Sequence, residues 1–277
     1  MRWSWRRGYG EPVDPTLRWE SGARLSAQWR PDRVAVLAHW SADGSLSRSV
    51  RELAGSLSGY GFEVVLVSAA EFEGDRPGGW PDQPLSASLY RRPNSGYDFG
   101  TWSATLAALP QLCRAREVIL ANDSMVGPFS SLSPVLERML RTPSDVWSLT
   151  DSRQFGWHPQ SYFVGYRNGV LGEPAMRGFW RSVRVHSSKD EIIRRYELGL
   201  GRVLLREAFS TAVAFPSESV GTNNGENPTI RAWRALLDAG FPMVKRQLLT
   251  EPEVAADSGN ILVEVRRRFG TDIEEWI

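Results

Sequence analysis

Short apolar runs alternate with an amphipathic stretch at the start of the regular part of the chain. Residues 34–38, 64–67 and 118–121 are continuous apolar runs, which are typical of strands buried on both faces of a parallel sheet. Between the first two runs, residues 47–58 repeat apolar side chains at helical spacing, and glycines follow directly. The pattern therefore predicts a strand, a helix and a second strand in succession.

The next elements follow the same plan. Residues 74–84 are rich in glycine and proline and predict a loop. A third strand is predicted near residues 88–90 and a helix over about 101–109, before the run at 118–121. In the second half, strands are predicted at 145–150 and 161–166. Three helices are predicted at 173–183, at 190–208 with a break at Gly199 and Gly201, and at 229–239.

This order of elements predicts an α/β fold, with a mostly parallel sheet flanked by helices and a mostly helical C-terminal half. Residues 1–30 show no clear period and are predicted to form an N-terminal arm or an added helix. A boundary near residue 130 would divide one domain into two halves, 31–130 and 131–277, rather than separate two free domains.

Composition narrows the class of protein. The 277 residues are 42% hydrophobic with a net charge of +1, and the arginine clusters are scattered, so we expect no nucleic-acid partner. The single cysteine, Cys113, excludes an internal disulfide and fits a reducing compartment.

The start lacks the apolar region of a signal peptide, and no run reaches the roughly 20 residues that span a bilayer. We expect a cytoplasmic protein, whose Trp- and Arg-rich start could contact a membrane surface or form a loose arm.

Two polar clusters interrupt the apolar middle of the chain. Residues 91–100 follow the third strand, and Asn122, Asp123 and Ser124 end the fourth. Groups at the carboxyl ends of strands form the ligand sites of open α/β sheets. Asp98 could face a ligand or cap the following helix. The oxygens of residues 122–124 could bind Mg²⁺ or Mn²⁺ on a diphosphate, or form a capping turn.

Other candidate residues are more dispersed. His39 and Ser41 follow the first strand and could touch a nucleotide, although Ser41 could equally serve the turn. His158 could bind the same metal or a phosphate, or complete a turn. Glu197 could act as a general base or pair with a nearby arginine. Lys245 could balance a diphosphate charge or extend along a strand end. The chain has no P-loop, nucleophile elbow or dinucleotide-binding glycine motif.

Several motifs, in this order, resemble the rhamnan synthesis F family of glycosyltransferases over roughly residues 33–250. They are Ala38-His39-Trp40-Ser41, Arg92-Pro93-Asn94-x-Gly96-Tyr97-Asp98-Phe99-Gly100-x-Trp102, Ala121-Asn122-Asp123-Ser124-x-x-Gly127-Pro128, Asp145-Val146-Trp147-x-Leu149-Thr150-Asp151-Ser152, His158-Pro159-Gln160-Ser161-Tyr162-Phe163, Tyr196-Glu197-x-Gly199-Leu200, Asn227-Pro228-Thr229 through Trp233, and Gly240-Phe241-Pro242-x-Val244-Lys245.

The resemblance implies a GT-A-like, Rossmann-type nucleotide-diphosphosugar transferase. Residues 31–130 would form its nucleotide-sugar-binding half and 131–277 its acceptor-binding and catalytic half. Asn122-Asp123-Ser124 looks like the counterpart of an Asp-x-Asp metal motif that has lost its outer carboxylates, so Asp123 and His158 become the candidate ligands of a Mg²⁺ or Mn²⁺ ion. The implied donor-pocket residues are His39, Ser41, Arg92, Asn94, Gly96, Asp98, Asn122, Ser124, His158 and Lys245.

The implied reaction transfers a sugar, such as rhamnose from dTDP-L-rhamnose, to a hydroxyl of a glycan or lipid-linked acceptor. Glu197 is the expected catalytic base, and Asp123 with its metal, or Lys245 and His158, would stabilise the leaving diphosphate. The alternative is a non-catalytic module that binds a nucleotide sugar or glycan and carries a decayed metal motif. A metal-dependent phosphodiesterase would need more histidine and carboxylate ligands than the chain offers in a recognisable spacing.

Overall fold

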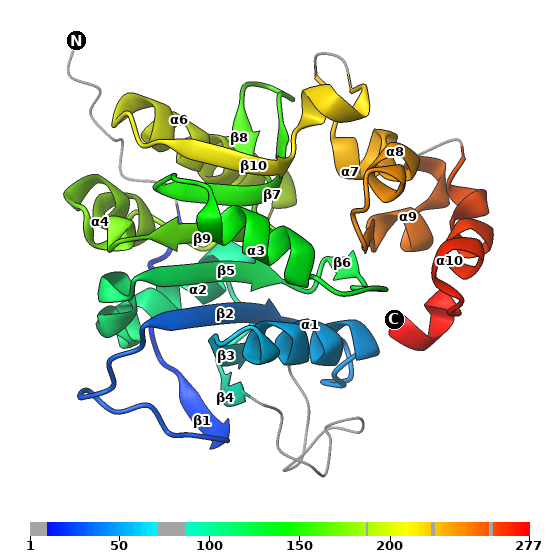
Figure 1. Cartoon of the computed structure of the whole chain (residues 1–277). Helices are drawn as coiled ribbons and strands as arrows, with labels where there is room; N and C mark the ends of the chain where they lie inside the picture. The colour runs from blue at the N-terminus through cyan, green and yellow to red at the C-terminus, as the bar shows by residue number, and fades with distance from the viewer. Residues whose placement is uncertain (1–9, 71–86, 187, 223–224, 255–256) are drawn as a thin grey trace.

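The computed structural model describes residues 10–70, 87–186, 188–222, 225–254 and 257–277 (Figure 1). Its centre is a twisted sheet in the order β1-β4-β3-β2-β5-β9-β7-β10, with β8 paired to β7. The strands are β1 (Arg18–Ser21), β2 (Arg33–His39), β3 (Glu63–Ser68), β4 (Ala87–Arg91), β5 (Glu117–Asn122), β7 (Val146–Ser152), β8 (His158–Pro159), β9 (Phe163–Arg167) and β10 (Thr211–Phe215).

The predicted α/β class is confirmed, and the sheet that was predicted to be mostly parallel is a mixed sheet. Strands β4, β3, β2 and β5 pair in parallel, as do β7 and β10. Strand β9 lies antiparallel between β5 and β7. Because β9 runs the opposite way, the carboxyl end of β5 lies beside the amino end of β9, where residues 160–162 enter the sheet.

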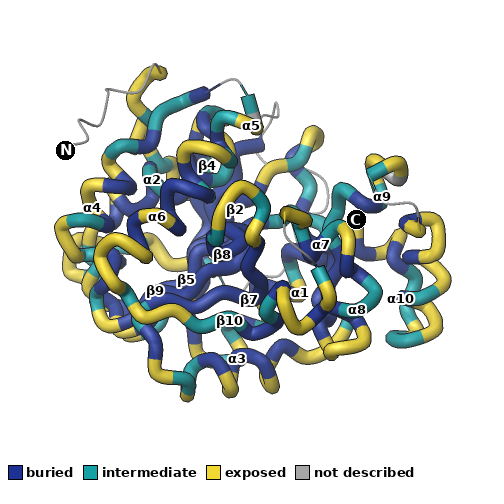
Figure 2. The backbone as a smooth tube through the Cα atoms, turned by 90° about the horizontal axis from the view of Figure 1, so that it is seen from above, coloured by how far each residue is buried: buried dark blue, intermediate teal, exposed yellow. Residues whose placement is uncertain are grey.

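Helices cover both faces of the sheet because each has one apolar face. On one face lie α1 (Arg48–Gly59) and α3 (Ser133–Arg141), whose buried side chains join the cluster of Leu37, Leu66 and Ile119. On the other lie α2 (Tyr97–Ala108), α4 (Pro174–Arg181) and α6 (Leu198–Arg206), packed around Val36, Val65 and Leu120. Figure 2 shows β5, β7 and β9 buried between these layers.

The end of the chain forms a smaller cluster beside the sheet. It contains α7 (Pro228–Arg231), α8 (Trp233–Asp238), α9 (Gln247–Thr250) and α10 (Ile261–Phe269). A two-stranded sheet attaches the cluster to the rest, because β11 (Val244–Lys245) pairs with β6 (Met125–Val126). Val126, Trp233, Val244 and Ile261 are buried together there. This pairing places Lys245 next to the residues that follow β5.

Several predicted elements differ from the structure. Residues 18–21 form an edge strand antiparallel to β4, rather than an arm or a helix, because that edge offers unpaired backbone groups. Helix α2 begins at Tyr97, four residues earlier than predicted, with Gly96 before it in the left-handed conformation. The predicted helix at 229–239 is divided into α7 and α8 at Ala232, and β10 was not predicted.

The predicted helix at 190–208 is not broken at its glycines. It runs as α5 (Lys189–Ile192), a π-helical segment (Ile193–Glu197) and α6, without interruption. Gly201 instead permits close packing, since an added Cβ would lie 2.4 Å from the carbonyl oxygen of Trp157. The predicted loop at 74–84 and the first nine residues lie outside the described residues.

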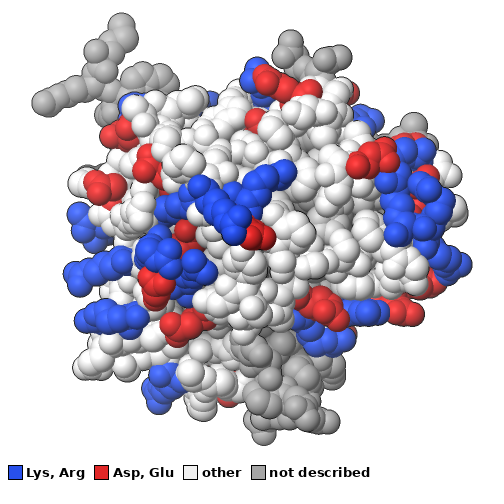
Figure 3. Space-filling model, in the orientation of Figure 1, with Lys and Arg blue, Asp and Glu red and all other residues white. Residues whose placement is uncertain are grey.

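Two further properties bear on function. In the described ranges, no helix is both long and apolar enough to cross a membrane. On the face shown in Figure 3, acidic side chains lie among the basic ones, as the near-zero net charge predicts.

Candidate functional site

A cavity of about 590 Å³ lies at the carboxyl ends of β2 and β5, and we call it the cleft. The two sequence clusters around Asp98 and Asn122 meet here, together with side chains from distant parts of the chain. Its polar lining includes His39, Ser41, Asp98, Asn122, Asp123, Ser124, Gln160, Ser161, Glu197, Asn227, Lys245 and Arg246. The placement follows the rule that open α/β sheets bind ligands beyond the carboxyl ends of their strands.

A chain of hydrogen bonds crosses the floor of the cleft. The side-chain amide of Asn122 donates to Asp98 Oδ2 over 2.6 Å, and its oxygen accepts from Ser124 Oγ over 2.7 Å. The ammonium of Lys245 donates to Ser124 Oγ over 3.1 Å. Through Ser124, Asn122 therefore connects the carboxylate of Asp98 to an ammonium group. Both the amide nitrogen and the oxygen of its side chain are engaged within the protein.

Asp123 is held at the junction of β2 and the C-terminal cluster. Its Oδ2 accepts a hydrogen bond from the backbone N–H of Trp40 over 2.8 Å, and its carbonyl oxygen accepts one from Arg246 Nε over 3.2 Å. Burial raises the pKa of Asp123 to about 6, against the opposing effects of the Trp40 amide and the charge of Arg246. Asp123 is therefore mostly ionised at pH 7.

Asp98 titrates near neutral pH. Burial raises its pKa to about 7, and the negative charges of Asp123 and Glu197 act in the same direction. The Asn122 amide and the charge of Lys245 oppose this shift. The cleft thus gains one negative charge as the pH rises through about 7, which disfavours an anionic ligand.

Glu197 lies across the cleft at the end of the π-helical segment. Its Oε1 accepts a hydrogen bond from Ser161 Oγ, which orients the carboxylate from the strand side. Wide helical turns of this kind are frequent at functional sites. The contact joins two motifs that are 36 residues apart in the sequence.

His39 and Ser41 line the cleft, but both are engaged in its wall. The ring of His39 lies 3.0 Å from Ser68 Oγ through Nδ1 and 3.1 Å from the carbonyl oxygen of Ser45 through Nε2. Burial lowers its pKa to about 4, so the ring is neutral at pH 7. Ser41 Oγ donates to the same carbonyl oxygen over 2.9 Å. These contacts fix the turn after β2.

Four of the ten predicted donor-pocket residues do not line the cleft, and three of them belong to the turn before α2. Arg92 is buried beneath the turn, where its guanidinium donates to Ser95 and Thr101. Asn94 is exposed on that turn. Gly96 has a φ of +78° and directly precedes α2, a conformation that favours glycine. These residues shape the turn that presents Asp98.

His158 also lies outside the cleft lining. It is buried, and its Nδ1 lies 2.9 Å from the carbonyl oxygen of Gly156. The two candidate metal ligands, Asp123 and His158, are therefore not brought together. Among the described residues, no group of three or more His, Cys, Asp or Glu side chains could hold a metal ion. Asp98 and Asp123 are the carboxylates that the cleft lining offers near the end of β5, and a cation bound there together with a diphosphate stays a prediction.

Sequence reasoning did not assign Arg246, Ser161 or Trp40 to the site. Arg246 follows Lys245 directly, and this pair of cations was the available signal. Ser161 and Trp40 stand inside motifs already recognised, but only the folded chain shows that one contacts Glu197 and the other Asp123.

Comparison with known proteins agrees with the sequence motifs. A family described as rhamnan synthesis protein F matches residues 67–274, a range that starts later and ends later than the motifs suggest. The virulence protein VirA of Vibrio anguillarum is 24% identical over 191 residues, covering 58% of this chain and 61% of that protein. The uncharacterized protein y4gN of Sinorhizobium fredii is 23% identical over 155 residues, covering 54% of this chain and 40% of that protein. The chain thus spans less than two thirds of the length of these relatives. Because the family match covers most of its own length, the chain belongs to the rhamnan synthesis protein F family.

Proposed function

We propose that the chain is a glycosyltransferase that moves a sugar from a nucleotide diphosphate sugar to a hydroxyl of a glycan or lipid-linked acceptor. The observation that carries the proposal is the composition of the cleft. It holds a carboxylate, Glu197, and a pair of cations, Lys245 and Arg246, at the carboxyl ends of parallel strands. Membership of the rhamnan synthesis protein F family supports a role in polysaccharide synthesis.

The strand order supports a GT-A-like arrangement as part of this proposal. The parallel strands β2 and β5 end at the cleft, and β9 lies antiparallel beside β5. The donor nucleotide would lie over the ends of β2 and β5, because that is where such sheets bind nucleotides. The acceptor would enter from the side of Glu197 and α7.

The proposed reaction is a displacement at the anomeric carbon. Glu197 takes the proton of the acceptor hydroxyl, and the acceptor oxygen forms the new bond to that carbon. The bond from the anomeric carbon to the diphosphate oxygen breaks, and the nucleoside diphosphate leaves with the electron pair. Negative charge develops on the leaving oxygen, so Lys245 and Arg246 stabilise the transition state.

We assign charge neutralisation to these cations because both line the cleft, whereas His158, one of the two expected metal ligands, does not. Lys245 is positioned by Ser124, and Arg246 by the carbonyl oxygen of Asp123. Ser124 and Asp123 thus act as positioning residues for the two cations. Rhamnose is the proposed sugar, on the strength of the family description alone.

A non-catalytic nucleotide-sugar or glycan-binding module is the second candidate. One observation favours it: both ends of the Asn122 side chain are engaged by Asp98 and Ser124 rather than directed to a ligand. Both candidates require a nucleotide sugar or glycan in the cleft. They differ in turnover, which depends on Glu197.

Thermal unfolding against a panel of nucleoside diphosphates and nucleotide sugars, with and without Mg²⁺, tests the proposal. A ligand at about 100 times its dissociation constant stabilises the folded state by about 2.7 kcal/mol. We expect stabilisation by dTDP or dTDP-rhamnose without Mg²⁺, and none in an Arg246→Gln variant. Arg202→Gln is the matched control, since Arg202 is an exposed arginine on α6 that does not line the cleft. No stabilisation by any member of the panel would contradict a donor site in the cleft, and with it the transferase, and would leave glycan binding as the function.

Turnover then distinguishes the two candidates. Purified protein, the stabilising nucleotide sugar and a glycan extract should release free nucleoside diphosphate in an acceptor-dependent way. Binding without any release, under conditions where the wild-type protein is folded and saturated, would leave the binding module as the function.

A further inference from the structure

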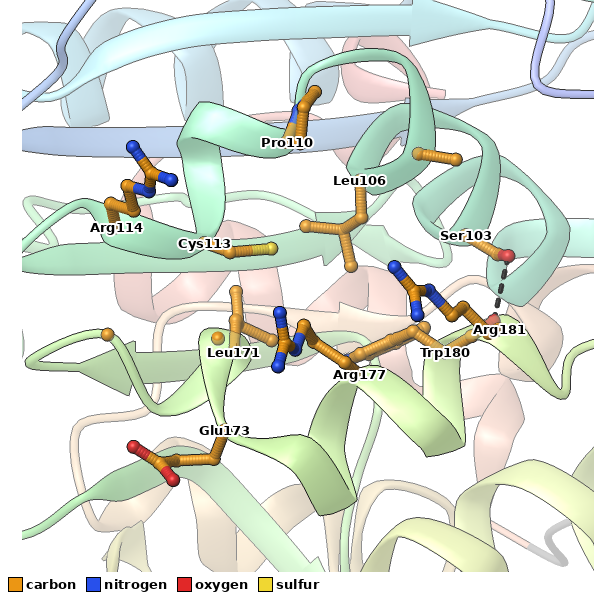
Figure 4. A pocket seen from close by; sticks show the side chains of 13 residues that line it. Ser103, Leu106, Pro110, Cys113, Arg114, Leu171, Glu173, Arg177, Trp180 and Arg181 are labelled. Atoms are coloured by element: carbon orange, nitrogen blue, oxygen red, sulfur yellow. Dashed lines mark hydrogen bonds between the residues drawn. The ribbon is translucent and has the colours of Figure 1, made fainter.

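A second cavity, of about 550 Å³, lies between α2, α4 and the short helices η1 (Pro110–Arg114) and η2 (Val170–Gly172) (Figure 4). It is remote from the cleft, because η1 precedes the amino end of β5 and η2 follows the carboxyl end of the antiparallel strand β9. Both lie at the ends of the strands opposite to the cleft. Helix α2 joins the two sites: Asp98 in its first turn lines the cleft, and Leu106 in its last turn lines the second cavity.

The inner wall of the second cavity is apolar. Leu106, Leu171 and Trp180 line it and are 6%, 1% and 4% exposed. The hydroxyl of Ser103 is already used, since it donates to the carbonyl oxygen of Trp180 over 3.0 Å. The volume and the apolar wall are those of a small-molecule pocket.

The mouth of the cavity carries positive charge. Arg177 and Arg181 are exposed, one helical turn apart on α4, and Figure 4 shows their guanidinium groups on the same side of the helix. Arg114 adds a third cation to the lining. Within the described ranges, none of these three side chains forms an ion pair, and the carboxylate of Glu173 points away from them in Figure 4. Like charges at this spacing destabilise a helix, so a bound anion would relieve a local repulsion.

The positive potential extends into the cavity. The Cys113 thiol lies among the lining residues, and burial raises its pKa. The charges of Arg177 and Arg181 oppose that shift. Both arginines therefore act on groups inside the cavity as well as on solvent.

We propose that this second cavity binds an amphiphilic phosphate, with the phosphate on Arg177 and Arg181 and the apolar chain against Leu106, Leu171 and Trp180. Guanidinium groups match the oxygens of a phosphate in paired hydrogen bonds, and the adjacent wall requires an apolar body. The proposal does not rest on the transferase function, because none of these residues lines the cleft.

Isothermal titration with decyl phosphate, below its micellar concentration, tests the proposal, with inorganic phosphate and decanol as the two partial ligands. We expect decyl phosphate to bind at least about tenfold more tightly than either, and to lose at least about tenfold in the double variant Arg177→Gln, Arg181→Gln, because hydrogen bonds to charged groups are lost. Arg194→Gln with Arg202→Gln is the matched control, since these exposed arginines line neither cavity. Equal binding by both double variants would overturn the proposal, as would equal affinity for decyl phosphate and inorganic phosphate.

A second pair of variants removes any dependence on the folding of the arginine variant. Ala107 and Ala108 are adjacent and exposed in the last turn of α2, but only Ala107 lines the second cavity. Ala107→Glu should weaken decyl phosphate binding and Ala108→Glu should not. Equal effects of the two would refute the site.

Vesicles then identify the source of the phosphate. Arginine-dependent binding to phosphatidylglycerol vesicles, but not to phosphatidylcholine vesicles, would identify a membrane lipid. Decyl phosphate binding without vesicle binding would identify a free amphiphile. Both outcomes support the site, whereas vesicle binding that is unchanged in the arginine variant contradicts it.

Discussion

Replacing Lys245 by methionine removes the ammonium while keeping a long apolar side chain. The ammonium lies 3.1 Å from Ser124 Oγ and 5.5 Å from the centre of the Tyr162 ring, so its position is fixed on two sides. A hydrogen bond to a charged group contributes about 1.5–3 kcal/mol. Since about 1.4 kcal/mol corresponds to tenfold in affinity, we expect Lys245→Met to weaken nucleoside diphosphate binding by about 10- to 100-fold.

The same substitution should change the pH dependence of binding. The charge of Lys245 lowers the pKa of Asp98, which burial has raised to about 7. Wild-type binding of an anionic diphosphate should weaken as the pH rises through about 7, because Asp98 becomes ionised. Without Lys245 the pKa of Asp98 rises, so the midpoint of that decline should move to higher pH.

Isothermal titration between pH 6 and pH 9, with the nucleoside diphosphate that stabilises the protein most, measures both effects. Arg202→Met on α6 is the control, because it removes one positive charge from an exposed position outside the cleft. Unchanged affinity in Lys245→Met would refute the placement of the diphosphate beside Ser124. A weaker affinity with an unmoved pH midpoint would refute the coupling to Asp98.

Three other predictions concern turnover and stability. Glu197→Gln keeps the side-chain shape but removes a base, so acceptor-dependent release of nucleoside diphosphate should fall by about 10²–10⁴-fold with donor binding intact; near-normal turnover would exclude Glu197 as the base. Because the pKa of Asp98 is raised from 3.8 to about 7, its contribution to stability is present below about pH 4 and is lost as the pH rises through 7. The fall in melting temperature between pH 5 and pH 8 should therefore be smaller in Asp98→Asn than in the wild-type protein, and an equal fall would contradict this assignment. Gly165→Ala should lower the free energy of unfolding in urea by about 3 kcal/mol, because the new Cβ would lie 2.2 Å from the buried Trp147 ring, whereas Gly178→Ala, with open space, should not destabilise.

The strands and helices of the first half are largely determined by local sequence. The run at residues 34–38 became β2, the amphipathic stretch became α1, and the run at 118–121 became β5, each within one or two residues at its ends. Ser47 marks the start of α1, where its hydroxyl accepts from the backbone N–H of Val50. The family resemblance could also be read from the sequence, because its motifs keep their order.

The site was predictable where its residues follow such strands. Asn122 ends β5, Asp123 follows it and Asp98 lies in the first turn of α2, so the rule for open sheets places them together. The roles of Arg92 and His158 could not be predicted in this way. Both are buried by contacts with their own loops, and a polar residue near a strand end has the same sequence signature in either case.

Only the tertiary structure decided which distant segments complete the cleft. Strand β9 lies antiparallel beside β5 and brings Ser161 toward Glu197, and the β6–β11 pairing brings Lys245 and Arg246 beside Ser124 and Asp123. The hydrophobic pattern fixes the type of each element and its buried face, because these depend on neighbouring residues. Strand partners and their direction depend on contacts between segments that are far apart in the sequence, and such contacts leave no period in it.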